Sequence, residues 1–137
     1  MPGIFDLWNA LLGSQKGKLP DDVELEVSSA NAATANNQTL AAAAGFRTYL
    51  SGFVVTGAGA TAGSTIAITI TGLTSTLNFR LIIPAGAGVG VTPLIVVFDR
   101  PIAASADNTA IVVNVPSFGA GNTDAAAAAW GFRRKAQ

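Results

Sequence analysis

The stretch that most constrains this fold is residues 64–72, which have the sequence Ser-Thr-Ile-Ala-Ile-Thr-Ile-Thr-Gly. Ile66, Ile68 and Ile70 alternate with threonine and alanine, so the three isoleucines point to one face and the smaller residues to the other. Isoleucine and threonine have restricted χ1 angles that suit a pleated sheet better than a helix. The stretch therefore predicts a half-buried β-strand.

Six other segments have strand patterns, namely residues 22–28, 46–56, 77–84, 91–99, 109–115 and 126–133. Residues 72–76 are short enough to join two of the predicted strands as a hairpin. Residues 94–98 are apolar without interruption, which predicts a strand that is buried on both faces. The alanine run within 126–133 leaves a short helix as the alternative to a last strand.

The spacing of these strands, about a dozen residues with Gly and Pro between them, predicts an antiparallel β-sandwich or jelly roll. No segment of crossover-helix length lies between the strands, which disfavours a parallel α/β sheet. We expect this all-β domain to span residues 41–137. Residues 1–40 then form an extended N-terminal arm with a short helix, a linker and one strand. Residues 29–44 are a low-complexity linker or form a weak helix around residues 40–44.

The arm opens with apolar residues at helical i, i+3, i+4 and i+7 spacing, and Gly13 follows as a helix stop. These residues are Ile4, Phe5, Leu7, Trp8, Leu11 and Leu12. A helix of about ten residues is only marginally stable alone in water, so this one must dock on another surface. That surface is either the chain's own sandwich or a neighbouring subunit or partner, and the six residues are candidate partner-binding residues.

Charged residues make up 12% of the chain, whereas typical soluble domains contain about 25%. Either a monomer has a surface of Ala, Ser, Thr and Gly, or further copies of the chain cover part of the surface, and we favour the second interpretation. The formal net charge is zero, which provides no overall field to attract nucleic acid. Glycines and prolines interrupt the uncharged stretches, so we expect no membrane-spanning segment.

The chain contains no Cys and no His, which excludes Cys- and His-based catalytic pairs and the usual zinc sites. The acidic residues within 21–26 lack the spacing of a calcium loop and indicate a solvated edge strand. Arg133, Arg134 and Lys135 form a basic segment beside Trp130, for which a solvated terminus is favoured over contact with nucleic acid or an acidic surface. We therefore expect no enzyme, no cofactor and no metal site.

The tripeptide Gly-Ala-Gly occurs three times, each time after a predicted strand. Loops that follow alternate strands of an antiparallel arrangement emerge at the same end, so the three tripeptides should lie together. Their glycines are Gly57, Gly59, Gly86, Gly88, Gly119 and Gly121. One hypothesis is that this end packs against the backbone of a partner, where side chains would not fit. The favoured alternative is that they are ordinary turn glycines.

Several segments between residues 45 and 133 carry a resemblance to a known class of protein. They are residues 63–73 (GSTIAITITGL), 83–86 (IPAG), 101–102 (PI), 108–113 (NTAIVV), 118–123 (FGAGNT) and 130–132 (WGF). Together they resemble small structural proteins of tailed bacteriophages, and the nearest class is that of the capsid decoration, or cement, proteins with jelly-roll folds.

The resemblance implies a structural virion protein that binds the outside of the capsid as a homo-oligomer, often a trimer and sometimes a dimer, and stabilises the shell. The major capsid protein would then be its partner, and an N-terminal arm such as residues 1–40 would reach neighbouring proteins. The alternative is a head-fibre or tail module that binds a host-surface receptor or carbohydrate. A receptor-binding module should have exposed aromatic or polar loops, whereas the loops here consist of Gly, Ala, Ser and Thr. Carbohydrate binding needs a platform of Trp or Tyr, whereas Trp8, Tyr49 and Trp130 are widely spaced in the sequence.

Overall fold

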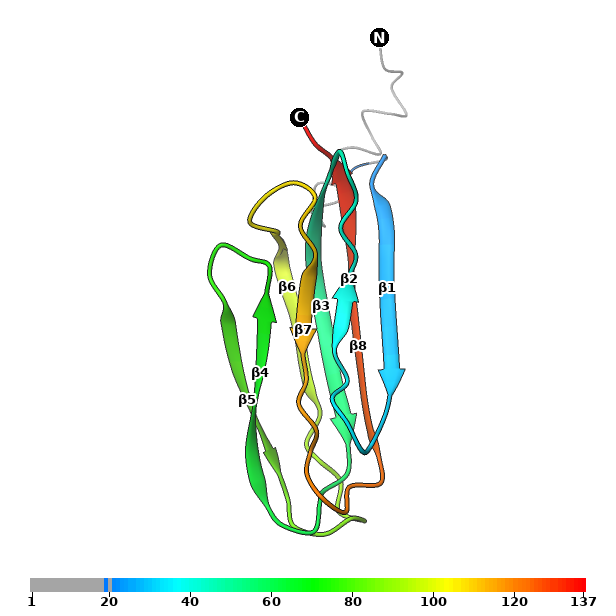
Figure 1. The fold of residues 1–137 in the computed structure, drawn as a ribbon, viewed down its shortest axis with the longest axis vertical. Coiled ribbons are helices and arrows are strands. Elements are labelled where there is room, and N and C mark those ends of the chain that lie inside the picture. Colours follow the sequence, from blue (N-terminus) through cyan, green and yellow to red (C-terminus); the bar gives the residue numbers. More distant parts are fainter. Residues whose placement is uncertain (1–18, 20) are drawn as a thin grey trace.

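The computed structural model describes Leu19 and residues 21–137, and every regular element in this part of the chain is a β-strand (Figure 1). The strands are β1 (Val23–Ala30), β2 (Gln38–Leu40), β3 (Phe46–Gly57), β4 (Ser64–Thr71), β5 (Leu77–Ile83), β6 (Leu94–Ala103), β7 (Ile111–Asn114) and β8 (Ala125–Lys135). Residues 1–18 and Pro20 lie outside the described residues. The predicted helix and its residues Ile4, Phe5, Leu7, Trp8, Leu11 and Leu12 lie there too.

The eight strands form two four-stranded antiparallel sheets. Sheet A has the order β1-β8-β3-β6 and sheet B has the order β2-β7-β4-β5. The strands pair as they would in one long hairpin that has its tip between β4 and β5 and is rolled up into two layers. In this hairpin β1 pairs with β8, β2 with β7, β3 with β6 and β4 with β5. The fold is a jelly roll, as the strand pattern predicted.

The tip of this rolled hairpin is the predicted turn at residues 72–76. β4 and β5 pair from Ser64↔Ile83 to Ile70↔Leu77, which confirms the hairpin. Gly72 has a φ of +89°, and a Cβ atom there would lie 2.0 Å from the carbonyl oxygen of Ala110. A side chain at this position would therefore be disfavoured by the backbone conformation and would also clash with the backbone of Ala110.

The core lies between the sheets and is filled by the alternating residues of both. Ile68 and Ile70 of β4 and Phe53 and Val55 of β3 are fully buried, as the alternation predicted. The alanine run forms strand β8 and not a helix, because it pairs with both β1 and β3 along its length. Its small inward residues lie opposite the larger side chains of sheet B, so the two sheets interdigitate.

Two expectations about the arm are corrected. The linker expected at residues 29–44 contains strand β2, which pairs with β7 and buries Leu40 completely. β1 pairs with β8 over its whole length, so residues 23–40 belong to the sandwich and the expected boundary at residue 40 does not hold. A three-residue strand is too short to show an alternation, and only its partner strand reveals it.

The expectation of a strand buried on both faces at residues 91–99 is also corrected. The strand is β6, an edge strand of sheet A, and its outward residues Ile95 and Val97 are exposed. Apolar runs are typical of strands covered on both faces, but the sequence does not say whether the covering layer belongs to the same chain.

Candidate functional site

The three glycine tripeptides meet at the end of the molecule drawn at the bottom of Figure 1, which confirms their predicted clustering. The Gly86 amide donates to the carbonyl of Ala60, just after the first tripeptide, at 2.6 Å. The Thr61 amide donates to the carbonyl of Ala120, inside the third tripeptide, at 2.9 Å. Backbone hydrogen bonds therefore tie all three loops together.

Most of these glycines are needed for contacts within the chain. A Cβ atom on Gly59 would lie 2.3 Å from the carbonyl oxygen of Pro84, and one on Gly121 would lie 2.0 Å from Oγ1 of Thr61. Gly57, Gly86 and Gly119 have positive φ angles. Gly88 differs from the other five because it has no positive φ and a Cβ atom there would meet nothing within 4 Å beyond its chain neighbours. The partner-binding role of this end stays a prediction.

Asn122 is the polar side chain that fastens the loops, and no pattern in the sequence pointed to it. It is buried, and its Nδ2 atom donates to the carbonyls of Ala58, Gly59 and Asp124. Because a buried amide needs partners, these bonds hold the end of β3 against the start of β8. Hydrogen bonds therefore hold the loop end together, and most of its exposed residues are small, with Val89 as a larger apolar exception.

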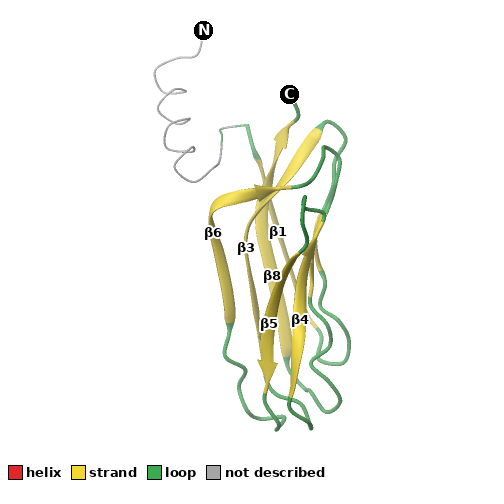
Figure 2. Ribbon diagram, turned by 90° about the vertical axis from the view of Figure 1, so that its left-hand side faces the viewer, coloured by secondary structure: helices red, strands yellow, loops and turns green. Residues whose placement is uncertain are grey.

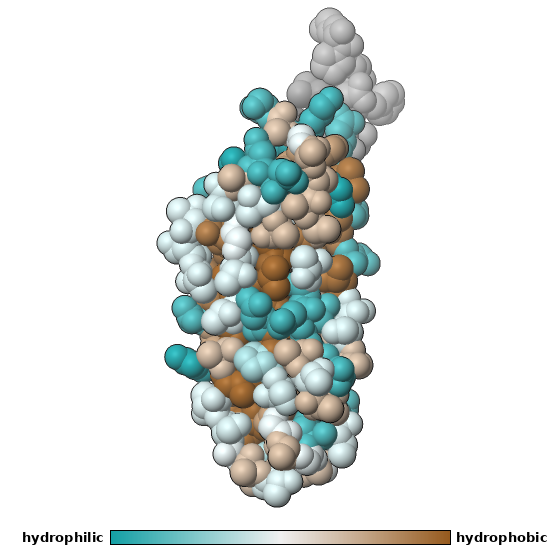
Figure 3. All heavy atoms as spheres, viewed as in Figure 1, coloured by the Kyte–Doolittle hydropathy of each residue, from teal (hydrophilic) through white to brown (hydrophobic). Residues whose placement is uncertain are grey.

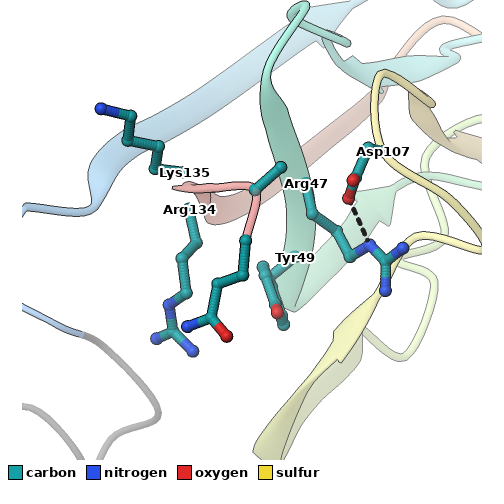
Figure 4. A pocket seen from close by; sticks show the side chains of 7 residues that line it. Arg47, Tyr49, Asp107, Arg134 and Lys135 are labelled. Atoms are coloured by element: carbon teal, nitrogen blue, oxygen red, sulfur yellow. Dashed lines mark hydrogen bonds and ion pairs between the residues drawn. The ribbon is translucent and has the colours of Figure 1, made fainter.

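The opposite end carries a pocket of about 290 Å³ lined by Arg47, Tyr49, Asp107, Arg134 and Lys135 (Figure 4). Nε of Arg47 lies 2.9 Å from Oδ1 of Asp107. The guanidinium of Arg134 lies over the stacked rings of Tyr49 and Phe132. The pocket thus gathers basic and aromatic groups, yet both arginines already have carboxylate partners.

The partner of Arg134 is Asp22, which accepts hydrogen bonds from Nε at 3.1 Å and from Nη2 at 3.0 Å. The hydrogen bond with Asp22 is the main cause that raises the pKa of Arg134 above its ordinary value. The expected solvated basic terminus is therefore corrected: residues 133–135 are part of β8, and Arg134 joins it to the residue before β1.

The two sheets meet on the side of β1 and β2, which we call the closed side. Gln38 of β2 is buried, and its Nε2 atom donates to Oγ of Ser29 on β1 and to the carbonyl of Asn36. The buried Asn36 donates from Nδ2 to the carbonyl of Asn31 at 2.9 Å. With the fully buried Leu40 beside them, these amides seal this side of the core.

The other side of the sandwich is formed by the edge strands β5 and β6, and Figure 2 looks onto it. Five inward residues of these strands contact the core but are only partly buried, namely Leu77, Phe79, Leu94, Val96 and Phe98, whereas Leu81 and Ile83 at the end of β5 are buried. The outward residues Ile82, Ile95 and Val97 are 72%, 65% and 67% exposed. A pocket of about 490 Å³ lies between the end of β5 and the start of β6. We call the surface formed by the five partly buried and the three exposed residues the open side.

The outer face of sheet B, which faces the viewer in Figure 3, differs from the open side. Residues of intermediate or hydrophilic character cover much of it, and the most hydrophobic residues show only in separate areas. Outward positions of β4 hold Thr65, Ala67 and Thr69, as the alternation predicted. The open side is therefore the part of the described surface where large apolar side chains gather on neighbouring edges.

The described residues include no group of three or more acidic, His or Cys side chains that could hold a metal ion. In the same part of the chain, no helix has both the length and the apolar character needed to cross a membrane. The chain matches no model of a known protein family and no curated protein sequence.

Proposed function

We propose that this chain is a structural virion protein of the capsid decoration class, which binds the outside of a phage capsid as a homo-oligomer and stabilises the shell. The observation that carries the proposal is the open side. A strand that is apolar on both faces lies at the edge of its sheet, with Ile95 and Val97 in water. Large apolar side chains exposed along an edge strand are typical of a surface that a partner covers in an assembly.

The fold supports the same proposal, although a jelly roll by itself does not define a function. The buried polar side chains Asn122 and Gln38 hold loops and edges of the sandwich together. A decoration protein works by binding the assembled shell better than its separated subunits, and the shell then gains stability by mass action. At a hundredfold excess over Kd, one bound site contributes about 2.7 kcal/mol.

The aromatic residues weigh against the receptor- or carbohydrate-binding alternative. Tyr49 is stacked on Phe132, with ring centroids 4.8 Å apart, and Arg134 lies over both rings. The indole of Trp130 lies over Gly52, where a Cβ atom would be 2.6 Å from the ring. These rings are occupied by contacts within the chain and do not form an open platform for a sugar.

The experiment is to add the purified protein to empty shells of the phage that encodes it, assembled without it. Scanning calorimetry should show a rise in shell disruption temperature that saturates with added protein, and a variant that lacks residues 1–18 should give a smaller rise. Shells mixed with an equal mass of an unrelated protein are the control. An unchanged disruption temperature, with the full-length protein folded and oligomeric, would refute the cementing role.

A further inference from the structure

We propose, on the basis of the proposed homo-oligomer, that this chain binds a second copy of itself through the open side. The copy covers the outward face of β6 and the gap between the edges of the two sheets. In the assembly, β6 then has the buried environment that its sequence predicts.

The core of the protomer is incomplete on this side. Phe79 of β5 contacts Phe53 edge-on, with ring centroids 5.3 Å apart, so the buried core reaches the edge strands. Phe53 is fully buried, whereas Phe79 and its counterpart on the other edge strand, Phe98, are only partly buried. A copy packed here extends an existing core and does not have to create a separate contact.

The charges around the open side suit a copy of the same surface. Arg80 on β5 and Asp99 and Arg100 on β6 are exposed, and none of them has an ion-pair partner within residues 21–137. A charged surface that binds a copy of itself is favoured when it carries both signs of charge, because opposite charges of the two copies can then face each other. Asp99 can pair with Arg80 or Arg100 of the second copy.

The area of the open side is sufficient for a stable contact. β6 has ten residues, which corresponds to a length of about 33 Å, and two packed sheets about 10 Å apart with their outward side chains give a width of about 20 Å. The open side therefore offers about 600–700 Å² per copy, within the range of about 600–1,000 Å² per partner found in stable interfaces.

The geometry of β6 also indicates where along the strand the contact is centred. Leu94 to Val97 pair regularly with β3, but the pairing is interrupted between Val97 and Ile102. Asp99, Arg100 and Pro101 lie in this interrupted part, and charges and proline at an edge discourage further strand pairing. The contact is thus centred on the apolar side chains of the first half, with the charges at its rim.

The test uses the full chain, which has no cysteine, so a single introduced thiol reports on one position. Val97→Cys and Ser28→Cys both alter outward positions of sheet A, the first on the open side and the second on β1 of the closed side. At protein concentrations where light scattering gives an oligomer, maleimide should label the thiol at position 97 at least about tenfold more slowly than the thiol at position 28. Dilution to the protomer should remove the difference.

A charge variant provides an independent measurement. Val97→Glu should lower the solution mass to that of the protomer, whereas Ser28→Glu should leave the oligomer intact. Both positions are exposed in the protomer, so both variants should fold, which circular dichroism checks.

The outcomes separate this proposal from the cementing role. An oligomer that survives Val97→Glu, or equal labelling at both positions, overturns the open-side contact. Protection at position 97 in a protomer, lost when residues 1–18 are deleted, also overturns it, because the arm and not a second copy is then the cover. Protection only when shells are added assigns the surface to the capsid protein and overturns it too. An oligomer that behaves as expected but leaves shells unchanged refutes cementing alone.

Discussion

The closed side and the open side of this jelly roll both consist of antiparallel edge strands, but they cover the core to different extents. On the closed side, buried amides connect β1 to β2, and Leu40 is fully buried. On the open side, no such amide joins β5 to β6 in the described residues, and Leu94 remains partly exposed. The sandwich thus completes its core on the closed side and leaves part of it in contact with water on the open side.

The connections between the strands explain the difference. The loop between β1 and β2 connects sheet A directly to sheet B. Within it, the backbone amide of Asn36 donates to the carbonyl of Val115 at 2.9 Å. The connection between β5 and β6 instead runs to the glycine loops, where the amide of Gly59 donates to the carbonyl of Val89. The second connection fixes the end of the sandwich but not the space between the edge strands.

The largest expected effect comes from a matched pair of leucine substitutions. Leu40→Ala should lower the free energy of unfolding by about 3 kcal/mol, because it opens a cavity in a fully buried site. Leu94→Ala should cost about 1 kcal/mol in the protomer, because its side chain is already partly in water. Urea unfolding of dilute samples measures both values.

Protein concentration sharpens this test. The cost of Leu94→Ala should grow as the oligomer forms, whereas the cost of Leu40→Ala should stay constant over the same range. Equal costs for the two variants at low concentration would mean that the open side is as complete as the closed side, and the contrast between the sides would not hold.

Much of this fold was predictable because its strands are long and alternate regularly. The isoleucines of β4 and the phenylalanine and valine of β3 indicate one buried face each, and seven of the eight strands were predicted. β2 was not predictable, because it has three residues and its burial depends on β7, over seventy positions away along the chain. The sequence also could not reveal that the apolar β6 lies at an edge, since a periodicity describes one strand and not its neighbours.

A smaller effect is expected from the buried amide of the closed side. Gln38→Met keeps the side-chain volume but leaves the carbonyl of Asn36 and the hydroxyl of Ser29 without this donor. The free energy of unfolding should fall by about 1–2 kcal/mol, independently of protein concentration. Thermal and urea unfolding measure it, with Thr39→Ala at the adjacent exposed position as the control. A fully stable Gln38→Met variant would show that apolar packing alone closes this side.

The candidate surfaces were less predictable than the strands. The glycine tripeptides signalled their own clustering, because loops after alternate antiparallel strands share an end. Asn122 carried no signal, because an asparagine in a loop is common and its three carbonyl partners come from two separate segments. Asp22 and Arg134 are 112 positions apart, so only the pairing of β1 with β8 brings them together.

The smallest expected effect concerns this ion pair, which fastens the start of β1 at the end of the closed side. The side chain of Asp22 is 2% exposed and that of Arg134 is 26% exposed, whereas the Arg47–Asp107 pair is 39% and 47% exposed. Asp22→Asn should therefore cost about 1 kcal/mol of unfolding free energy, and Asp107→Asn close to nothing. Equal effects of the two variants would show that the buried pair holds β1 no better than a surface contact does.

The pH dependence of the unfolding free energy lost in Asp22→Asn follows from the raised pKa of Arg134. A cation whose pKa is raised by folding contributes its stabilisation fully below its ordinary pKa, and loses it only as pH rises through the raised value. Because arginine titrates far above neutrality, the arginine's contribution should be the same at about pH 6 and about pH 9. Unfolding of wild type and Asp22→Asn at both values measures this, and a difference that shrinks towards pH 9 would mean that another group, and not Arg134, responds to the loss of the carboxylate.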